Sequence, residues 1–245
     1  MQSLKDKVTI VTGGGRGIGR ATAVLLAKEG AKVVVTARTM SEIDKVAKEI
    51  KGFGGSALAI QADVTVEDDI KRLVKETEAA FGPVDILVNN AGMLALSTVA
   101  ETSTEMWDKI ISVNLRAVFL ACREVLPGMI ARKSGRIINI GSMAGRRGYA
   151  EQGAYCASKH GLIGLSKVMA LETQKYGIRV NVVAPGGVLT DLSNNLRASR
   201  GAAAKDKDWM SSEEVAMGVL YLCTQTGPAM TDELVLRRYE SDPWR

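Results

Sequence analysis

The sequence has little of the chemistry on which many hydrolases and metal sites depend. Its 245 residues include one histidine, His160, and three widely spaced cysteines, Cys122, Cys156 and Cys223. A single histidine excludes the ordinary serine–histidine–aspartate and cysteine–histidine schemes unless it lies in a cleft. An odd number of cysteines without a histidine cluster argues against disulfides and structural zinc. We therefore expect no metal site, no such hydrolase, and packed, unreactive thiols.

Long hydrophobic runs and stripes of one charge are also missing. No apolar run approaches the roughly 20 residues of a membrane span, and segment 1–7 has no hydrophobic signal region. The 32 Lys and Arg residues and the 27 Asp and Glu residues give a net charge of +5, but the two signs are interspersed. Nucleic-acid-binding proteins gather their positive charge instead. We expect a cytoplasmic protein that binds neither nucleic acid nor membrane.

Short apolar runs alternate with amphipathic helix patterns along the whole chain. The expected strands are 8–11, 32–36, 57–61, 86–88, 136–140, 179–184 and 234–236. Such near-continuous apolar strands are typical of a parallel sheet buried on both faces. The length suits one α/β domain that buries roughly 70–75% of its unfolded surface. We predict a single domain over 1–245, a Rossmann-type, doubly wound parallel sheet of seven strands with helices on both faces.

Capping patterns predict where several helices begin. A hydroxyl residue followed three positions later by an acid can satisfy the free N–H groups of a first helical turn. Four such patterns precede amphipathic runs, at Ser41-x-x-Asp44, Thr65-x-x-Asp68, Thr102-x-x-Glu105 and Ser211-x-x-Glu214.

A glycine cluster follows the first expected strand and precedes a helix pattern. Segment 12–19 reads T-G-G-G-R-G-I-G, which has the spacing T-G-x-x-x-G-x-G with Gly13, Gly17 and Gly19 in register. Glycines at a strand-to-helix turn let the backbone approach a pyrophosphate, which then binds at the helix N-terminus. The segment therefore predicts a dinucleotide site, although its spacing differs from G-x-G-x-x-G.

A hydroxyl, a phenol and an ammonium are expected to meet at the same edge of the sheet. Tyr155 and Lys159 are four residues apart, so a helix places both on one face. Ser142 follows the expected strand 136–140, at the carboxyl edge where open α/β sheets bind ligands. These three side chains have the makings of a proton-transfer site.

Taken together, these motifs resemble the short-chain dehydrogenase/reductase family. The resemblance covers almost the whole chain and is strongest, over 82–190, to its 3-oxoacyl-carrier-protein reductase branch. It implies a catalytic set of Asn114, Ser142, Tyr155 and Lys159. It also implies cofactor contacts by Gly13, Gly15, Arg16, Gly17, Ile18, Gly19, Arg38, Asp63, Val64, Asn90, Ala91, Gly92, Tyr155, Lys159, Pro185, Gly186, Val188 and Thr190.

The end of the second strand favours NADP(H) as the cofactor. Ala37 stands where the family's NAD enzymes carry an acid for the ribose 2′-hydroxyl, and Arg38 follows it. Arg16 in the glycine segment supplies a second guanidinium, so two can hold a 2′-phosphate. Asp63 resembles the family's adenine-edge residue, but from sequence alone it is equally the polar end of a strand.

The resemblance implies reduction of a carbonyl group. Tyr155 would donate the proton, Ser142 would orient the carbonyl, and Lys159 would lower the pKa of the phenol, which is ordinarily near 10. By resemblance, Asn114 breaks a helix locally and keeps a water in the proton relay, whereas an Asn inside an apolar helix is otherwise a tolerated polar residue. Asn89 is expected to tie neighbouring strands together.

The expected substrate is a 3-oxoacyl thioester, either free or carried by an acyl carrier protein, and the chain is expected to form a homodimer or homotetramer. Arg132, Lys133 and Arg136 lie just before the strand that leads to Ser142, and they are the expected docking patch for such a carrier. Tyr176 stands where carrier-using relatives tend to have a second basic residue. Arg146 and Arg147 are expected at the mouth of the cleft, as solvated loop residues or in contact with an acidic substrate.

The C-terminal part departs from the family's pattern. Many members end their last strand with Val-Asp-Gly-Gly, whereas here segment 231–236 runs into R-R-Y-E-S-D-P-W-R. This ending is closer to small-carbonyl and hydroxy-acid reductases of the family, which are the alternative function. Segment 191–209 is the expected substrate lid. A non-catalytic NADP-binding sensor or scaffold is the alternative of another class.

Overall fold

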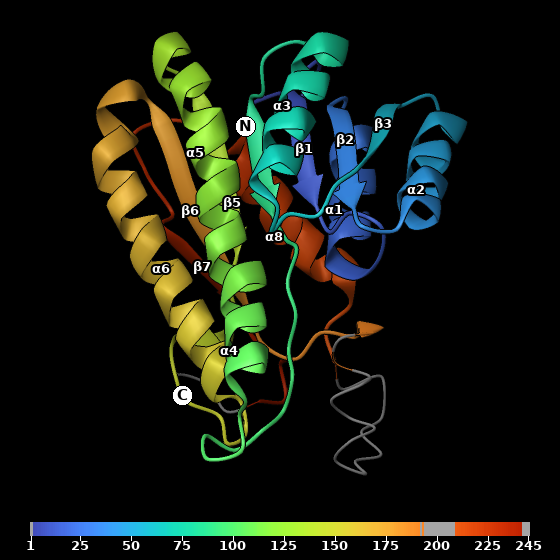
Figure 1. The fold of residues 1–245 in the computed structure, drawn as a ribbon. Helices are drawn as coiled ribbons and strands as arrows, with labels where there is room; N and C mark the ends of the chain where they lie inside the picture. The colour runs from blue at the N-terminus through green and yellow to red at the C-terminus, as the bar shows by residue number, and fades with distance from the viewer. Residues whose placement is uncertain (1, 192, 194–208, 242–245) are drawn as a thin grey trace.

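The fold is built on one parallel sheet. In the computed structural model, which describes residues 2–191, 193 and 209–241, seven strands follow the order β3-β2-β1-β4-β5-β6-β7 (Figure 1). The strands are β1 (Val8–Thr12), β2 (Lys32–Ala37), β3 (Ser56–Gln61), β4 (Ile86–Asn89), β5 (Gly135–Ile140), β6 (Ile178–Pro185) and β7 (Glu233–Leu236). Every pairing is parallel. The predicted doubly wound, seven-stranded sheet is confirmed.

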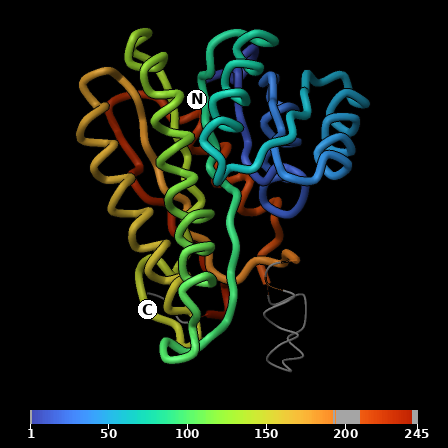
Figure 2. Tube along the Cα trace, in the orientation of Figure 1, coloured from blue at the N-terminus to red at the C-terminus, as the bar shows by residue number. Residues whose placement is uncertain are grey.

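Helices cover both faces of the sheet, as the ribbon and the tube both show (Figures 1 and 2). One face carries α1 (Gly17–Lys28), α2 (Met40–Gly52) and α8 (Ser212–Thr224), whose apolar residues share a core with the strands. The other face carries α3 (Glu67–Phe81), α5 (Ala117–Arg132) and α6 (Gly153–Thr173). Shorter elements are α4 (Thr104–Ile111), a π-helical turn η1 (Ser112–Arg116) and the 3-10 turns η2 (Met143–Gly145) and η3 (Gln174–Tyr176).

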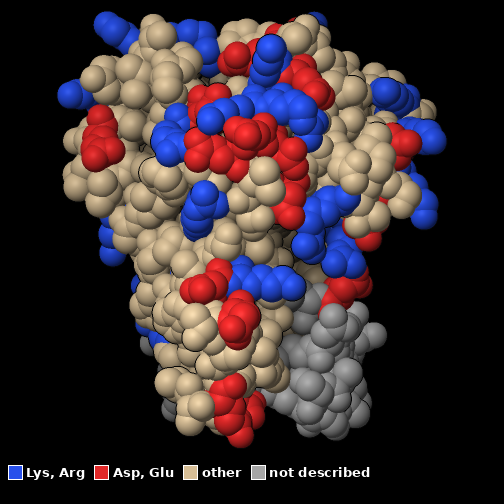
Figure 3. Space-filling model, in the orientation of Figure 1, with Lys and Arg blue, Asp and Glu red and all other residues tan. Residues whose placement is uncertain are grey.

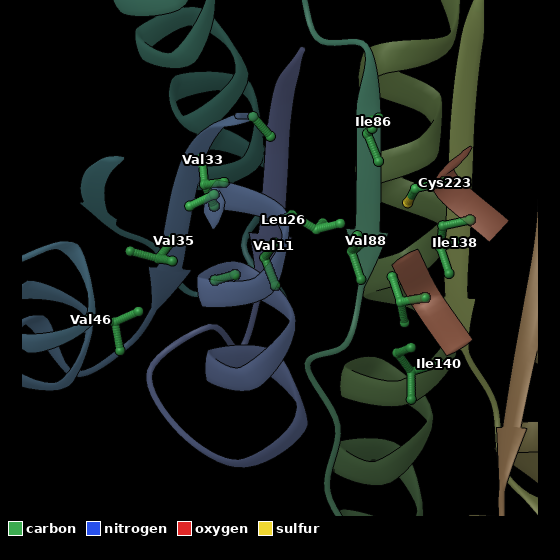
Figure 4. Packing of buried hydrophobic residues seen from close by; sticks show 14 of the residues in the cluster. Val11, Leu26, Val33, Val35, Val46, Ile86, Val88, Ile138, Ile140 and Cys223 are labelled. Atoms are coloured by element: carbon green, nitrogen blue, oxygen red, sulfur yellow. The ribbon is translucent and has the colours of Figure 1, made fainter. Parts of the chain in front are cut away.

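Each core forms because alternate strand residues point to opposite faces. On β2, Val33 and Val35 belong to one core, whereas Val34 between them belongs to the other. Figure 4 shows Val33, Val35 and residues of β1, β4 and β5 with Leu26 of α1 between them. Burial on both faces explains the near-continuous apolar strands of the sequence.

The predicted strands agree with the observed ones to within one residue at each end, but three of the four helix caps were wrong. Only Ser211 forms the predicted capping box, with Glu214. The helices expected to begin after Ser41, Thr65 and Thr102 instead have Thr39, Val66 and Ser103 at the N-cap. The hydroxyl groups of Thr65 and Thr102 donate to Asp63 and to the Thr98 carbonyl instead of capping.

The carboxyl ends of the strands lie at one edge of the sheet and gather the predicted motifs. The opposite, amino edge holds the expected docking patch of Arg132, Lys133 and Arg136, because β5 begins at Gly135 and reaches the cleft only at Ile140. The prediction that this patch lies beside the cleft of its own chain was therefore wrong. Arg132 and Arg136 are occupied with backbone carbonyls of Val84, Leu222 and Gln225.

Positive and negative side chains are mixed on the surface. On the face shown in Figure 3, Lys and Arg residues lie beside Asp and Glu residues, without a basic stripe. Several of these neighbours form ion pairs, such as Lys71 with Glu67 and Arg123 with Glu67. Within the described residues, no helix is long and apolar enough to cross a membrane.

Candidate active site

A cleft of about 1050 Å³ opens at the carboxyl edge of the sheet, above the ends of β1, β4, β5 and β6. The strand order reverses between β1 and β4, and this is the point at which doubly wound sheets bind their ligands. Almost all the predicted site residues line the cleft. Those that line it are Gly13, Gly15, Arg16, Gly17, Ile18, Arg38, Asp63, Val64, Asn90, Ala91, Gly92, Ser142, Tyr155, Lys159, Pro185, Gly186, Val188 and Thr190. Gly19 and Asn114 lie behind it.

The glycine segment forms a cradle that side chains would fill. Gly13 has φ +62°, and a Cβ there would lie 3.0 Å from the Ala91 Cα. A Cβ on Gly19 would lie only 2.2 Å from the Gly13 carbonyl oxygen, so α1 packs directly on the end of β1. α1 begins at Gly17, and its N-terminal N–H groups face the cleft. This arrangement fits a dinucleotide pyrophosphate.

The glycine segment is held in place by a clasp between β1 and β4. The Thr12 hydroxyl oxygen accepts from the backbone N–H groups of Asn90 and Ala91, at 3.0 and 3.1 Å. The Asn90 amide donates to the carbonyls of Thr12 and Gly13, at 2.9 and 3.1 Å. Asn90 therefore positions the segment in addition to lining the cleft. Thr12 was not among the predicted site residues.

Two arginines and one unpredicted acid lie at the end of the cleft beside β2. The Arg16 Nη1 atom lies 3.2 Å from Asp191 Oδ2 and 3.8 Å from Glu42 Oε1. Arg38 is exposed and lines the same part of the cleft. Ala37 ends β2 as predicted, but Glu42, in the first turn of α2, brings a carboxylate to this region. The sequence alone did not indicate Glu42 as a site residue, because only the fold brings α2 into contact with Gly15.

Ser142, Tyr155 and Lys159 meet at the end of β5. The Lys159 Nζ atom donates to the Ile140 carbonyl at 2.8 Å and lies 5.8 Å from the centroid of the Tyr155 ring. Ser142 caps η2, where its Oγ accepts from the Ala144 N–H at 3.1 Å. Ser142 and Tyr155 both line the cleft, and the Ser142 hydroxyl is near enough to the phenol to act on its pKa. The structure thus brings the three predicted side chains to one wall of the cleft.

Burial shifts both titratable groups toward their neutral forms. It lowers the pKa of Lys159 to about 8. It also raises the pKa of Tyr155, and the nearby Ser142 hydroxyl only partly opposes this. The chain alone therefore does not lower the pKa of the phenol, contrary to the expectation from Lys159. Tyr155 keeps its proton at neutral pH.

Asn114 supports the site from behind. It is buried inside η1, so the predicted local break in the helix is present as a π-helical turn, a feature often found near functional sites. Its Oδ1 accepts from the Met93 N–H at 2.8 Å, and its Nδ2 donates to the Met93 carbonyl and to Ser158 Oγ. Ser158 in turn donates to the Tyr155 carbonyl at 2.7 Å. Asn114 thus links the Met93 loop to the helix that carries Tyr155.

Other predicted residues have structural partners as well as places in the cleft wall. The Thr190 backbone N–H donates to Ser193 Oγ at 3.0 Å. The methyl group of Thr190 packs on the glycine segment, since a Cβ on Gly17 would lie 3.3 Å from it. Asp63 Oδ1 accepts from the backbone N–H and the hydroxyl of Thr65. Apart from Asp191 and Ser193 and from Trp209, the expected lid 191–209 lies outside the described residues.

The altered tail also reaches the cleft. Arg237, Arg238, Glu240 and Ser241 line it, together with Arg147 from the loop between β5 and α6. The position of Arg147 at the mouth of the cleft was predicted. Arg146 does not line the cleft and pairs with Glu233 at 3.7 Å.

The other polar and sulfur-containing residues that the sequence analysis singled out do not line the cleft. Asn89 ties β4 to β5 by donating to Asn139 Oδ1 at 2.9 Å. Cys122, Cys156 and Cys223 are buried free thiols, and burial raises the pKa of Cys122 and of Cys223 to about 12. His160 is exposed on α6 and is not part of the cleft wall. Within the described part of the chain, no cluster of His, Cys, Asp or Glu is suited to a metal ion.

The same fold occurs in solved structures of oxidoreductases. A metagenomic short-chain oxidoreductase in complex with NADP has a TM-score of 0.84 and 36% identity, over 98% of this chain and 100% of that one. Levodione reductase has a TM-score of 0.89 and 31% identity, over 96% of each chain.

Relatives of known name extend this likeness to the sequence. A 3-oxoacyl-[acyl-carrier-protein] reductase of Synechocystis sp. is 44% identical over 199 residues, 81% of each chain. One of Thermotoga maritima is 35% identical over 236 residues, which are 95% of this chain and 96% of that one. The family model of the short chain dehydrogenases matches residues 7–201. The chain therefore belongs to the short-chain dehydrogenase family, as the motifs indicated, and is an NAD(P)-dependent oxidoreductase acting on CH–OH and C=O groups.

Proposed function

We propose that the protein reduces a ketone with NADPH, and that its leading substrate is a 3-oxoacyl thioester. The observation that carries this proposal is the convergence of Ser142, Tyr155 and Lys159 on the wall of the cleft that also holds the glycine cradle. When bound, the reduced nicotinamide ring supplies the hydride. The side chains of the protein have the remaining task of neutralising the charge that develops on the carbonyl oxygen.

Tyr155 donates the proton in this proposal. Its raised pKa keeps the phenol protonated at neutral pH, which suits the direction of reduction. Ser142 holds the carbonyl oxygen beside the phenol, because both hydroxyl groups belong to the same wall of the cleft. The Lys159 ammonium, whose Nζ lies 5.8 Å from the centroid of the Tyr155 ring, adds a positive field where negative charge develops. Asn114 positions the helical turn that carries Tyr155, because it donates to Ser158, which in turn donates to the Tyr155 carbonyl.

The preference for NADPH rests on Arg16 and Arg38. Both side chains are accessible at the end of the cleft beside Ala37, and guanidinium groups are the usual partners of the 2′-phosphate. The neighbouring structure in complex with NADP supports the same cofactor. In this proposal the 2′-phosphate takes the place of Glu42 and Asp191 as the partner of Arg16.

The thioester substrate is supported by the names of the relatives, which are 3-oxoacyl-[acyl-carrier-protein] reductases. A small oxo acid is the second candidate, because the tail that replaces the family's usual ending brings Arg237 and Arg238 into the cleft. We also propose that the chain forms a homo-oligomer, since Val168 and Leu171 of α6 are 50% and 70% exposed. The molar mass in solution tests this proposal.

The test is a panel of 3-oxo substrates with NADPH and with NADH, followed by loss of the reduced cofactor's absorbance. We expect turnover with NADPH, and a loss of at least about a hundredfold in kcat for Tyr155→Phe, in the range of general acid catalysis. NADPH should still bind to that variant. Tyr176→Phe, which removes a phenol outside the cleft, is the matched control. Near-normal turnover by Tyr155→Phe would exclude Tyr155 as the proton donor.

A further inference from the structure

The C-terminal tail forms a compact turn at the substrate side of the cleft. Arg237 Nη1 donates to the carbonyls of Arg238, Tyr239 and Ser241, at 3.0, 2.9 and 2.8 Å. The Ser241 hydroxyl donates to the Arg238 carbonyl at 2.7 Å. The Arg237 guanidinium is therefore engaged in stabilising the turn. Arg238 contributes its backbone carbonyl to the turn but not its guanidinium.

The turn is anchored to the loop that follows β6. The Gly186 N–H donates to the Leu236 carbonyl at 2.8 Å, which continues the pairing of β6 with β7. A Cβ on Gly186 would lie 3.8 Å from both the Arg237 Cα and the Met143 Cγ. Since Met143 follows Ser142, the tail lies beside the residues proposed to hold the carbonyl. Its side chains can therefore meet a short substrate.

An aromatic platform holds the Arg238 guanidinium in this position. The guanidinium carbon lies 5.3 Å from the centroid of the Trp209 ring. The ring rests on Gly187, where a Cβ would lie 2.8 Å from the Trp209 Cζ3. Backbone bonds between Met210 and Gly187, and between Leu189 and Met210, fix this segment. Stacking orients a planar guanidinium and leaves its N–H donors available in its plane.

A second arginine is arranged in the same way. Arg147 lines the cleft, its Nε donates to the Tyr149 hydroxyl at 2.8 Å, and its guanidinium carbon lies 4.9 Å from that ring's centroid. Among the described residues, neither Arg147 nor Arg238 forms an ion pair. Arg16 and Arg146 at the same edge do, with Glu42, Asp191 and Glu233.

Among the residues that the structure describes, the acids that face this part of the cleft do not balance the positive charge. Glu240 is the acid that the tail contributes to the wall, and Asp191 is paired with Arg16. The same part of the wall has three positively charged residues, Arg147, Arg237 and Arg238. An anion that enters the cleft therefore meets two guanidiniums without carboxylate partners, which is the usual recognition of a carboxylate or phosphate.

We propose that the substrate carries an anionic group, and that Arg238, stacked on Trp209, binds it. Arg147 assists from the opposite loop. This inference rests on the proposed function, because it names the class of carbonyl compound that the same cleft reduces. The anion is the carboxylate of a short 3-oxo acid or the phosphate of a phosphopantetheine thioester, and the two sources can be separated by experiment.

The test compares two matched pairs of compounds that differ by one anionic group. The first pair is acetoacetate and methyl acetoacetate. The second is the 3-oxobutanoyl thioester of 4′-phosphopantetheine and that of pantetheine. In wild type we expect kcat/KM to favour the anionic member of at least one pair by at least tenfold. In Arg238→Gln this ratio should fall at least tenfold, and Arg238→Lys should restore part of it. The pair that responds identifies the source of the anion.

Equilibrium binding gives a second readout that does not depend on turnover. Titration calorimetry with the NADP⁺ complex should show tighter binding of the anionic member in wild type, and Arg238→Gln should weaken that binding at least tenfold. Lys175→Gln removes one charge at the amino edge of the sheet and is the matched control. Equal binding of both members in both pairs would overturn the proposal. Preferred binding of the anion without turnover would contradict the proposed function instead.

Discussion

Lys159 is the residue at which function and stability conflict most directly. Its side chain is 5% exposed and its Nζ has one described protein partner, the Ile140 carbonyl. Burial lowers its pKa from 10.5 to about 8, which corresponds to about 3 kcal/mol of preference for the neutral amine in the folded state. Neutral pH still lies below this pKa, so Lys159 remains mostly an ammonium, and that charge is what the proposed chemistry needs.

Replacing Lys159 by Met should make this cost visible. Between about pH 8 and pH 10.5 the unfolded wild-type chain binds more protons at this site than the folded one, so its stability rises with pH there. We expect the free energy of unfolding of wild type, relative to Lys159→Met, to rise by about 3 kcal/mol from below pH 8 to above pH 10.5. Urea titrations of both proteins across this range measure the difference. A difference that stays constant with pH would show that Lys159 is not desolvated.

Glu42 is the residue that tunes the cofactor preference in the proposed function. Its carboxylate lies 3.8 Å from Arg16, next to the place proposed for a 2′-phosphate, and repels that group. Glu42→Gln should therefore tighten NADPH binding about three- to fivefold, which is about 0.7–1 kcal/mol. NADH binding should stay unchanged or weaken. Fluorescence titration of both cofactors gives the dissociation constants.

Arg38→Ala is the companion change with the opposite expected sign. Loss of a charge-assisted contact of about 1.5–3 kcal/mol should weaken NADPH at least about tenfold and leave NADH little changed. If Glu42→Gln and Arg38→Ala shift both cofactors equally, the 2′-phosphate does not bind between these residues.

Two glycines in helices, Gly19 and Gly164, differ in how much room the fold leaves for a side chain. In α1, a Cβ on Gly19 would lie 2.2 Å from the Gly13 carbonyl, and 2.5 Å from the Asn90 amide. In α6, a Cβ on Gly164 meets no atom within 4 Å and faces solvent. Helix propensity favours alanine at both positions, but only α6 has room for it.

Gly19→Ala and Gly164→Ala should therefore have opposite effects on stability. Gly164 lies one turn before Val168, on the face proposed for oligomer contacts, so the comparison uses protein diluted to single chains. There we expect Gly164→Ala to raise the free energy of unfolding by about 0.5–1 kcal/mol. Gly19→Ala should lower it by about 3 kcal/mol, at the upper end of the cost of overpacking, and should also weaken cofactor binding. Chemical denaturation measures the first effect and cofactor titration the second. Equal effects in both helices would mean that α1 can move away from β1 at little cost.

The strands were predictable from the sequence because burial on both faces leaves a direct mark on composition. Segment 32–36, for example, is Lys-Val-Val-Val-Thr, and β2 extends only one residue further, to Ala37. The helix starts were less predictable because a hydroxyl group has several possible partners. Thr65 follows Asp63 closely and donates to it, which left Val66 at the N-cap of α3.

The candidate site was predictable where it depends on local spacing and not where it depends on packing. Tyr155 and Lys159 share a face because four residues separate them, and Ser142 follows a strand. Glu42 and Trp209 come from segments whose distance from the cleft is set by the whole fold. The predicted direction of the Tyr155 pKa shift was wrong for the same reason. The shift depends on how deeply the ring is buried, which the sequence does not show.

At the scale of the whole molecule, the sheet separates two kinds of positive surface. The cleft and its arginines lie at the carboxyl edge, whereas Arg132, Lys133 and Arg136 lie at the amino edge, a full strand length away. Strands of this length span about 20 Å, which exceeds the roughly 8 Å reach of surface charge at physiological ionic strength. Charges at the amino edge therefore cannot steer an acidic carrier to the cleft of the same chain.

This separation gives a test of whether a carrier protein delivers the substrate. If it does, activity on a 3-oxobutanoyl-carrier protein should exceed that on the free pantetheine thioester and fall steeply with salt, because the carrier is acidic. Arg147→Glu, at the carboxyl edge, should lower the carrier-dependent rate at least about tenfold more than it lowers the rate on the free 4′-phosphopantetheine thioester, which carries the phosphate that Arg147 is proposed to bind. Lys133→Glu should leave both rates unchanged. A loss in Lys133→Glu alone would place the docking surface on a second copy of the chain, whose amino edge would then lie beside this cleft. Equal, salt-independent rates on both substrates would favour the small-carbonyl enzyme, and the stacked arginines would then act on the substrate itself.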